Sequence, residues 1–346
     1  MVSMKAAVIS APYRFNIEEH DVPTPNAGEV LIRVHAVGIC GSDVHGMEAD
    51  GGQRRQPGLI MGHEAAGEIA AVGADVTSWK VGDRVAIDPQ LSCGYCYACE
   101  RGWKNLCENG VTIGSSRKQL THGTMREYIA VPTRQIYRLP DNVSFDEGAT
   151  LDFVGNAVHV LNRSNSKLGD TFLIIGTGAI GLIAVQLAKL RGAGKIIAVD
   201  TSDAKLKLAK QFGADRTINP LKEDVLTVVR AETGGYGAEI VLEMVGLSAT
   251  YATAVQAAKM QGTVMALGFA ADEVTLPSQA LLFNEVTIVG CTGFSFEGTT
   301  VLNMIADGRI DVKPLITHEY PLEHIEDGFK VLLDKQAEAI KVIIHP

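Results

Sequence analysis

Apolar residues in the first part of the chain occur in short runs separated by turn-forming residues. The runs are KAAVIS, EVLIRVHAVGI, AAGEIAAVG, DRVAI and REYIAV, with glycine, proline and Asp-Gly pairs between them. Short apolar runs bounded in this way are typical of β-strands. The pattern predicts a largely all-β region with few helices up to about residue 150.

The pattern changes near residue 167. TFLIIG is a short apolar run, IGLIAVQLAKL follows with helical spacing, and KIIAVD is again strand-like. Further strand candidates occur at EIVLEMV, GTVMALG and VTIVGC, and helix-like segments at 203–212 and 249–259 separate them. Strands that alternate with helices predict a parallel, doubly wound sheet.

Length and composition restrict the class of protein. A chain of 346 residues is long enough for two domains, since one domain commonly has about 100–200 residues. The chain is 46% hydrophobic and 21% charged, which excludes disordered and fibrous proteins. Its net charge of −9 argues against binding to nucleic acid or to a membrane surface. No apolar run approaches the roughly 18 residues of a membrane span, so we expect a cytoplasmic protein.

Four cysteines lie close together in SCGYCYACERGWKNLC: Cys93, Cys96, Cys99 and Cys107. The spacing C-x2-C-x2-C-x7-C allows one looping segment to place four thiolates around one Zn²⁺. Such a site has no open coordination position, so its predicted role is structural. An iron–sulfur cluster also uses four cysteines, but its known spacings differ.

A glycine-rich motif occurs where the first predicted strand of the doubly wound region meets its helix. IIGTGAIG contains Gly176, Gly178, Ile180 and Gly181 in the pattern G-x-G-x-x-G. The glycines permit a tight turn, close approach of a pyrophosphate and close helix–strand packing. The helix N-terminus then stabilises the phosphates. The motif predicts a dinucleotide site.

Asp200 indicates which dinucleotide binds. It stands nineteen residues after Gly181, at the end of KIIAVD, where a carboxylate can accept hydrogen bonds from the adenosine ribose. The same charge would repel the 2′-phosphate of NADP, so NAD is favoured. Lys205 follows and can reach the ribose, although an exposed helical lysine is an equally good interpretation.

A second metal site is suggested by residues that are scattered along the chain. Cys40 lies in GICGSDVHG, His63 precedes Glu64 in GHE, and Asp152 lies in GATLDFVGNAVH. A thiolate, an imidazole and a carboxylate would leave Zn²⁺ a fourth position for water or substrate, which is the pattern of a catalytic site. Spacing alone does not join these residues.

The run GHEAAGEIAAVGADV, residues 62–76, resembles the signature of zinc-containing medium-chain alcohol and polyol dehydrogenases of the sorbitol dehydrogenase type. The resemblance extends over essentially the whole chain. It implies that Cys40 and His63 bind the catalytic zinc and that Glu64 lies nearby and can ligate transiently. The third ligand would precede the nucleotide-binding domain, where sorbitol-type members carry Glu-Pro and this chain has Asp152-Phe153. A helix N-terminal carboxylate is the alternative for Asp152.

The resemblance also implies roles in proton transfer. Zinc lowers the proton affinity of the alcohol oxygen, and the alkoxide transfers hydride to nicotinamide. Ser42 would accept the proton and His45 would pass it to solvent. The alternatives are a turn hydroxyl for Ser42 and a surface histidine for His45.

The implied architecture is α/β, with a partly open, GroES-like β-barrel catalytic domain and an inserted doubly wound Rossmann domain. The catalytic domain would comprise residues 1–153 and 292–346, and the NAD-binding domain residues 154–291. We expect two zinc ions and NAD per chain. By analogy, we expect a homotetramer, or second a dimer, formed through residues 286–294.

The expected reaction is reversible oxidation of a secondary alcohol, with a polyol, sugar or sugar acid as substrate. A dehydrogenase of simple secondary alcohols is the alternative that Asp152 suggests. A zinc-free quinone or enoyl reductase of the same fold is disfavoured by Cys40, His63 and the four-cysteine segment. A nucleic-acid-binding zinc ribbon is disfavoured by the acidic charge and the cysteine spacing.

Two adjacent arginines provide a hypothesis about the substrate. Arg54 and Arg55 lie in the polar segment between His45 and Gly62, which must pass close to the zinc ligands. A guanidinium group suits bidentate binding of a carboxylate or phosphate on the substrate. A solvated turn is the alternative.

Overall fold

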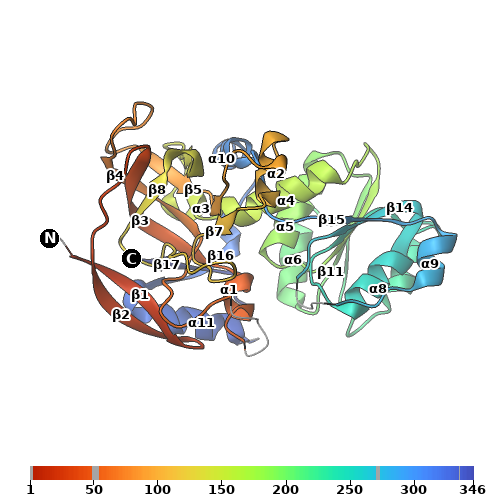
Figure 1. The fold of residues 1–346 in the computed structure, drawn as a ribbon. Coiled ribbons are helices and arrows are strands. Elements are labelled where there is room, and N and C mark those ends of the chain that lie inside the picture. Colours follow the sequence, from red (N-terminus) through yellow and green to blue (C-terminus); the bar gives the residue numbers. More distant parts are fainter. Residues whose placement is uncertain (1–2, 49–53, 270–272, 335) are drawn as a thin grey trace. The chain divides into compact units, whose positions relative to one another are not determined.

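The computed structural model describes residues 3–48, 54–269, 273–334 and 336–346 (Figure 1). The chain forms two compact units. Unit 1 comprises Met1–Gly155 and Phe294–Pro346, and unit 2 comprises Asn156–Gly293. Within the described residues, no helix is long and apolar enough to cross a membrane.

Unit 2 contains a six-stranded parallel sheet in the order β12-β11-β10-β13-β14-β15. The strands are β10 (Thr171–Ile175), β11 (Lys195–Val199), β12 (Arg216–Ile218), β13 (Ala238–Glu243), β14 (Ala258–Ala266) and β15 (Thr287–Gly290). The order reverses at β10, so the predicted parallel, doubly wound sheet is confirmed.

Helices connect these strands. They are α5 (Ala179–Leu190), α6 (Asp203–Phe212), α7 (Val225–Glu232), α8 (Ser248–Ala257) and α9 (Ser278–Phe283). Helix α6 matches the predicted segment, since the Ser202 hydroxyl caps its start and Gly213, with φ of 114°, ends it. Helix α8 ends before the predicted limit because Ala258 is already extended and pairs with Ala238.

The core of unit 2 explains its strongly apolar strands. Leu173 and Ile174 are successive residues of β10 and therefore point to opposite faces of the sheet. Both are fully buried, so both faces are covered. Parallel strands buried on both faces have continuous apolar sequences, as TFLIIG does.

Unit 1 is built on a seven-stranded sheet in the order β16-β17-β3-β4-β5-β9, with β8 paired to β3. The strands are β3 (Glu29–Ile39), β4 (Glu64–Val72), β5 (Arg84–Ile87), β8 (Tyr128–Pro132), β9 (Ile136–Arg138), β16 (Ile316–Pro321) and β17 (Lys341–His345). The C-terminal β17 lies beside β3, so unit 1 combines segments from both ends of the chain. The β3–β4 pairing contains two register shifts, at Leu31/Ile32 and Val34/Ala36, which increase local bending.

Two small sheets and several short helices complete unit 1. The small sheets pair β1 (Ser3–Ala11) with β2 (Arg14–Asp21), and β6 (Gln90–Leu91) with β7 (Val111–Thr112). The helices are α1 (Gly41–His45), α2 (Tyr97–Glu100), α3 (Phe145–Gly148), α10 (Gly298–Ala306) and α11 (Ile325–Leu333), and α4 (Leu151–Arg163) crosses the boundary between the units. Single 3-10 turns occupy Lys104–Leu106, Thr133–Gln135, Lys313–Leu315 and Leu322–His324.

The apolar runs predicted as strands are strands, but the pattern missed β2. Its sequence RFNIEEHD is mainly polar, and none of its residues is fully buried. It pairs only with β1, so burial did not select apolar residues there.

Two leucines five residues apart test the packing of unit 2. Leu173→Ala removes a side chain that is 0% exposed, whereas Leu168→Ala changes one that is 86% exposed. We expect a loss of about 2–5 kcal/mol in the free energy of unfolding for the first and within about 0.5 kcal/mol for the second. Urea unfolding of both variants beside the wild type measures the difference. Equal effects would contradict the assigned core.

Candidate active site and metal centres

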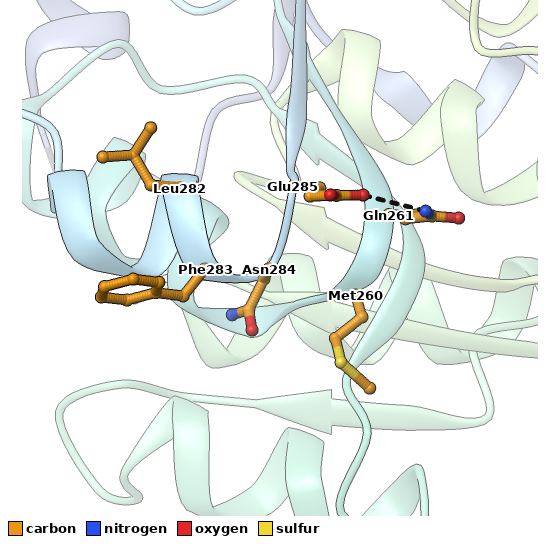
Figure 2. Close-up of a pocket in the computed structure, with 6 residues that line it drawn as sticks. All are labelled: Met260, Gln261, Leu282, Phe283, Asn284 and Glu285. Carbon is orange, nitrogen blue, oxygen red and sulfur yellow. Dashed lines mark hydrogen bonds between the residues drawn. The ribbon is translucent and has the colours of Figure 1, made fainter.

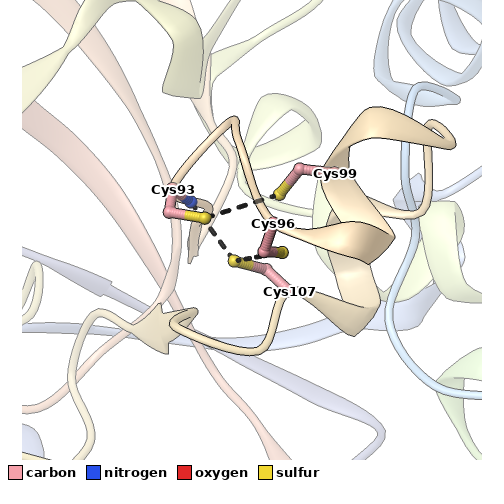
Figure 3. Close-up of side chains that lie close together, drawn as sticks. All are labelled: Cys93, Cys96, Cys99 and Cys107. Atoms are coloured by element: carbon pink, nitrogen blue, oxygen red, sulfur yellow. Dashed lines mark hydrogen bonds between the residues drawn. The ribbon is translucent and has the colours of Figure 1, made fainter.

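The four-cysteine segment folds into a compact lobe. Its sulfur atoms lie within 4.8 Å of one another (Figure 3). The sulfurs of Cys93 and Cys99 are 4.0 Å apart, and those of Cys96 and Cys107 are 3.8 Å apart. Four sulfurs at about 2.3 Å from a tetrahedral Zn²⁺ would be about 3.8 Å from each other. The lobe therefore fits one structural zinc ion.

The electrostatics of the lobe also favour a cation. Backbone N–H groups, first that of Tyr95, lower the pKa of the Cys93 thiol to about 6. Burial, together with the neighbouring cysteines, raises the pKa of Cys99 to about 12. Four thiolates at these distances would repel one another without a positive charge between them. Zinc supplies that charge and holds all four as thiolates.

A buried ion pair attaches the lobe to the rest of unit 1. Lys104 lies between the lobe cysteines, and its ammonium group contacts the Asp88 carboxylate and donates to Tyr137 Oη at 2.9 Å. The backbone N–H of Lys104 donates to Ser295 Oγ at 3.0 Å, and this hydroxyl donates to Gly102 O at 2.7 Å. These contacts of Lys104 could not be predicted from the sequence, because they join residues that are far apart in the chain and belong to no motif.

The second metal centre depends on the pairing of β3 with β4. Cys40 directly follows β3, His63 directly precedes β4, and Gly38 lies opposite Glu64 in the register. One ligand atom from each of Cys40, His63 and Glu64 lies within 4.8 Å of the others. A Cβ on Gly38 would lie 2.2 Å from Glu64 Oε2, so a larger residue there would displace this carboxylate.

The donor set of this cluster fits zinc. A thiol, an imidazole and a carboxylate are ligands that Zn²⁺ prefers. Oε1 of Glu64 is buried and has no hydrogen-bond partner among the described residues. Buried polar atoms without a partner are rare in proteins, and a bound cation would satisfy this one.

Asp152, the predicted third ligand, lies in the first turn of α4. It is not among the three residues whose ligand atoms converge within 4.8 Å, and Glu64 takes that place. Its side chain keeps some accessible surface yet lies deep among protein atoms. Burial raises the pKa of Asp152 to about 7, with the positive charge of His63 opposing the shift and the negative charge of Glu64 adding to it. Direct ligation by Asp152 stays a prediction.

Lys341 holds the other oxygen of Glu64. Its buried ammonium group donates to Glu64 Oε2 at 2.6 Å and to the Ile39 carbonyl at 3.0 Å. Burial alone would lower the pKa of Lys341, but the charge of Glu64 raises it above its ordinary value. The sequence analysis missed this residue. The lysine at the start of the apolar run KVIIH could have indicated a buried charge that needs a carboxylate partner.

Asp43 contacts both predicted ligands, Cys40 and His63. It is fully buried, its Oδ2 accepts the backbone N–H of Cys40 at 3.1 Å, and its Oδ1 lies 3.4 Å from His63 Nδ1. Burial would raise the pKa of Asp43, but the charges of His63 and Arg55 hold it well below its usual range. The charge of Asp43 in turn raises the pKa of His63 against the effect of burial.

The predicted relay residues lie on α1. Ser42 and His45 are both exposed, and His45 Nδ1 lies 3.1 Å from Glu48 Oε2. Helix α1 begins immediately after Cys40, so Ser42 lies within one turn of a predicted metal ligand. Proton transfer through these two residues stays a prediction.

Arg55 is buried against Asp43. It is 9% exposed, its Nε donates to Asp43 Oδ1 at 2.9 Å, and its Nη2 forms an ion pair with the same oxygen at 2.8 Å. The guanidinium group is therefore unavailable for the hypothesised substrate carboxylate or phosphate. Residues 49–53 of the same segment lie outside the described residues.

The glycine motif of unit 2 has the conformation that a dinucleotide site needs. Gly176 follows β10 with φ of 93°, and Gly178 is the N-cap of α5. A Cβ on Gly181 would lie 2.0 Å from the Gly176 carbonyl, whereas a Cβ on Gly178 would meet no described atom within 4 Å. The N-terminus of α5 is thus open to a phosphate. Ile180 lies in the first turn of this helix.

Asp200 follows β11 and binds the backbone of the glycine motif. Its two carboxylate oxygens accept the backbone N–H groups of Thr177 and Ser202 at 2.8 and 2.9 Å. Lys205 lies in the first turn of α6, and its backbone N–H donates to Ser202 Oγ at 3.4 Å. A negative charge is therefore fixed beside the glycine loop.

Comparisons with known proteins agree with the fold and with both metal centres. Residues 26–141 match the alcohol dehydrogenase GroES-like domain, and residues 179–307 match the zinc-binding dehydrogenase family. Sorbitol dehydrogenase of Bacillus subtilis is 35% identical over 99% of this chain and 98% of its own length. L-threonine 3-dehydrogenase of Caldanaerobacter subterraneus is 35% identical over 96% of this chain and 95% of its own length. A solved Escherichia coli oxidoreductase of unknown specificity superposes with a TM-score of 0.94 at 32% identity, covering 99% of both chains.

The fold and the two cysteine-containing centres define a zinc-dependent dehydrogenase that uses a nicotinamide dinucleotide. The chain belongs to the zinc-binding medium-chain dehydrogenase family. The predicted resemblance and the predicted combination of a GroES-like domain with a doubly wound domain are therefore confirmed.

The two centres predict separable effects of cysteine substitution. Cys40→Ala should keep the fold and lose most of its turnover, while Cys99→Ala should lower stability or soluble yield because a structural zinc contributes folding energy. Zinc content should fall from two ions per chain to one in each variant. Cys291→Ala is the matched control, since Cys291 belongs to neither cluster, and it should keep both ions. One zinc per chain in fully active wild type would refute the two-site prediction.

Proposed function

We propose that the protein catalyses the reversible, NAD-dependent oxidation of a secondary alcohol in a polyol, sugar or sugar acid. The observation that carries this proposal is the convergence of Cys40, His63 and Glu64 in a largely buried cluster, where Glu64 Oε1 has no hydrogen-bond partner among the described residues. The similarity to sorbitol dehydrogenase favours a polyol-like substrate. The similarity to L-threonine 3-dehydrogenase makes L-threonine the second candidate.

In this proposal unit 1 is the catalytic domain and unit 2 the NAD-binding domain. Cys40 and His63 hold the catalytic zinc, and Asp152 or Glu64 supplies the carboxylate. These residues would hold a zinc ion that, when bound, would supply Lewis-acid polarisation of an alcohol oxygen. Ser42 accepts the alcohol proton, and the exposed His45 passes it to solvent.

Glu64 is suited to a supporting part in this chemistry. Lys341 binds its Oε2, while its Oε1 has no partner among the described residues. Oε2 is therefore held by the Lys341 ammonium group, and Oε1 can ligate a metal ion. Lys341 restrains the carboxylate and balances its charge.

NAD is proposed over NADP because of Asp200. Both of its oxygens already accept backbone N–H groups of the glycine loop and the following turn, so the carboxylate cannot move away from a 2′-phosphate without breaking these bonds. A fixed anion beside the ribose accepts hydroxyl hydrogen bonds and repels a phosphate.

A homotetramer, or second a homodimer, is proposed through the edge of the unit 2 sheet. Strand β15 is the edge strand, in the region of residues 286–294. Exposed apolar side chains of Met260, Leu282 and Phe283 line a shallow pocket near it (Figure 2). An exposed apolar patch beside the edge strand of a sheet supports self-association.

The substrate proposal is tested by NADH formation across polyols, sugars, sugar acids, L-threonine and simple secondary alcohols. We expect the highest kcat/KM on a polyol, sugar or sugar acid. Activity should vanish after removal of zinc by a chelator and return when zinc is added. A higher kcat/KM on L-threonine or on a simple alcohol would overturn the substrate class, and activity without zinc would overturn the mechanism.

Asp200→Ala tests the choice of cofactor. Charged hydrogen bonds contribute roughly 1.5–3 kcal/mol each, so NAD binding should weaken by at least about tenfold and the preference over NADP should narrow. Asp224→Ala is the matched control, because Asp224 also accepts a backbone N–H, that of Thr227 at 2.8 Å, but caps α7. Equal kcat/KM for the two cofactors in the wild type would refute the assignment.

A further inference from the structure

Arg55 is a buried arginine of unit 1, whereas most arginines lie at the protein surface. Its side chain is almost fully buried, and its stem packs against the end of α1. Gly46 makes room for it, since a Cβ there would lie 2.7 Å from Arg55 Cγ. Burying a guanidinium group is costly unless an anion and good hydrogen bonds compensate for the lost solvent.

The compensating anion is Asp43. Arg55 Nε donates to Asp43 Oδ1 at 2.9 Å, Nη2 forms an ion pair with the same oxygen at 2.8 Å, and Nη1 donates to the Arg54 carbonyl at 3.0 Å. The guanidinium plane is thus fixed at three points. A lysine, with a single charged nitrogen, cannot reproduce this arrangement.

Asp43 in turn contacts both predicted metal ligands. Its Oδ2 binds the backbone N–H of Cys40, and its Oδ1, the oxygen that Arg55 holds, lies 3.4 Å from His63 Nδ1. Asp43 therefore spans the end of β3 and the start of β4. Movement of this carboxylate would change the relative positions of a thiolate ligand and an imidazole ligand.

Charge makes Arg55 necessary for this arrangement. Asp43 is 0% exposed, and besides Arg55 it contacts the backbone N–H of Cys40 and Nδ1 of His63. Lys341 is bound to Glu64 on the other side. Arg55 is thus a permanent cation bound to Asp43, and without it the buried carboxylate would keep only its contacts with the Cys40 N–H and with His63.

We propose that Arg55 is a positioning residue of the catalytic zinc site, which acts by holding Asp43 against Cys40 and His63. The residue does not touch substrate. Its contribution is to the affinity and geometry of the metal site, where groups that orient the ligands commonly affect metal affinity by about 10–100-fold.

The test measures zinc retention rather than turnover. Arg55→Ala and Arg55→Lys are exposed to a chelator, and zinc release is followed with time. The structural zinc of the same protein is the internal reference, and Cys40→Ala identifies which phase belongs to the catalytic site. We expect the catalytic phase to accelerate by at least about tenfold in Arg55→Ala and less in Arg55→Lys, with the structural phase unchanged.

Two further variants separate positioning from general stability. Arg84→Ala is the matched control, because Arg84 is a hydrogen-bonded arginine of unit 1 that binds the carbonyls of Pro140 and Val143. It should leave the catalytic phase unchanged. In an Asp43→Asn background, removing Arg55 should add little, because Arg55 acts through Asp43.

Zinc release equal to wild type in both Arg55 variants would overturn the proposal, as would equal acceleration in Arg84→Ala. Additive effects of Asp43→Asn and Arg55→Ala would also overturn it. If Arg55→Ala does not fold, the rate of zinc release from Arg55→Lys alone decides whether the proposal stands. None of these outcomes depends on which alcohol the enzyme oxidises, so failure of the substrate proposal would be seen separately.

Discussion

The pairing of β3 with β4 is the constraint on which the active site depends. Strand β3 is central in unit 1 and pairs with β4, β8 and β17. Because Gly38 lies opposite Glu64, Cys40 and His63 come together at the same end of two adjacent strands. A shift of one residue in this register would turn the ligands to opposite faces of the sheet. The apolar faces of both strands, buried in one core, prevent that shift.

Bringing the ligands together concentrates negative charge in the interior, and the fold compensates for it with two buried cations. Lys341 comes from the C-terminal strand and binds Glu64, while Arg55 precedes β4 and binds Asp43. Each cation is held by a carbonyl as well as by its carboxylate. The C-terminal segment is therefore required for the charge balance of the site as well as for the sheet.

The sequence predicted best those features whose residues lie close together in the chain. The four cysteines from Cys93 to Cys107 and the glycine motif from Gly176 to Gly181 each form within one local segment, so spacing reveals their chemistry. The catalytic cluster required a resemblance to known proteins, because strand register rather than spacing joins its members. Lys341 was missed because an isolated lysine carries no pattern that points to a partner nearly three hundred residues away.

The two metal centres differ in how the chain assembles them: one forms within a single segment, and the other joins residues that are far apart in the chain. The structural lobe is closed by four ligands from one segment, and Lys104 with Asp88 attaches it to unit 1. The predicted catalytic cluster takes its residues from the adjoining ends of two strands, and Glu64 Oε1 has no hydrogen-bond partner in the part of the chain that the structure describes. A site assembled from several rigid elements can keep an open position without collapsing, because each element is held by packing outside the site. A catalytic zinc needs such an open position for its substrate.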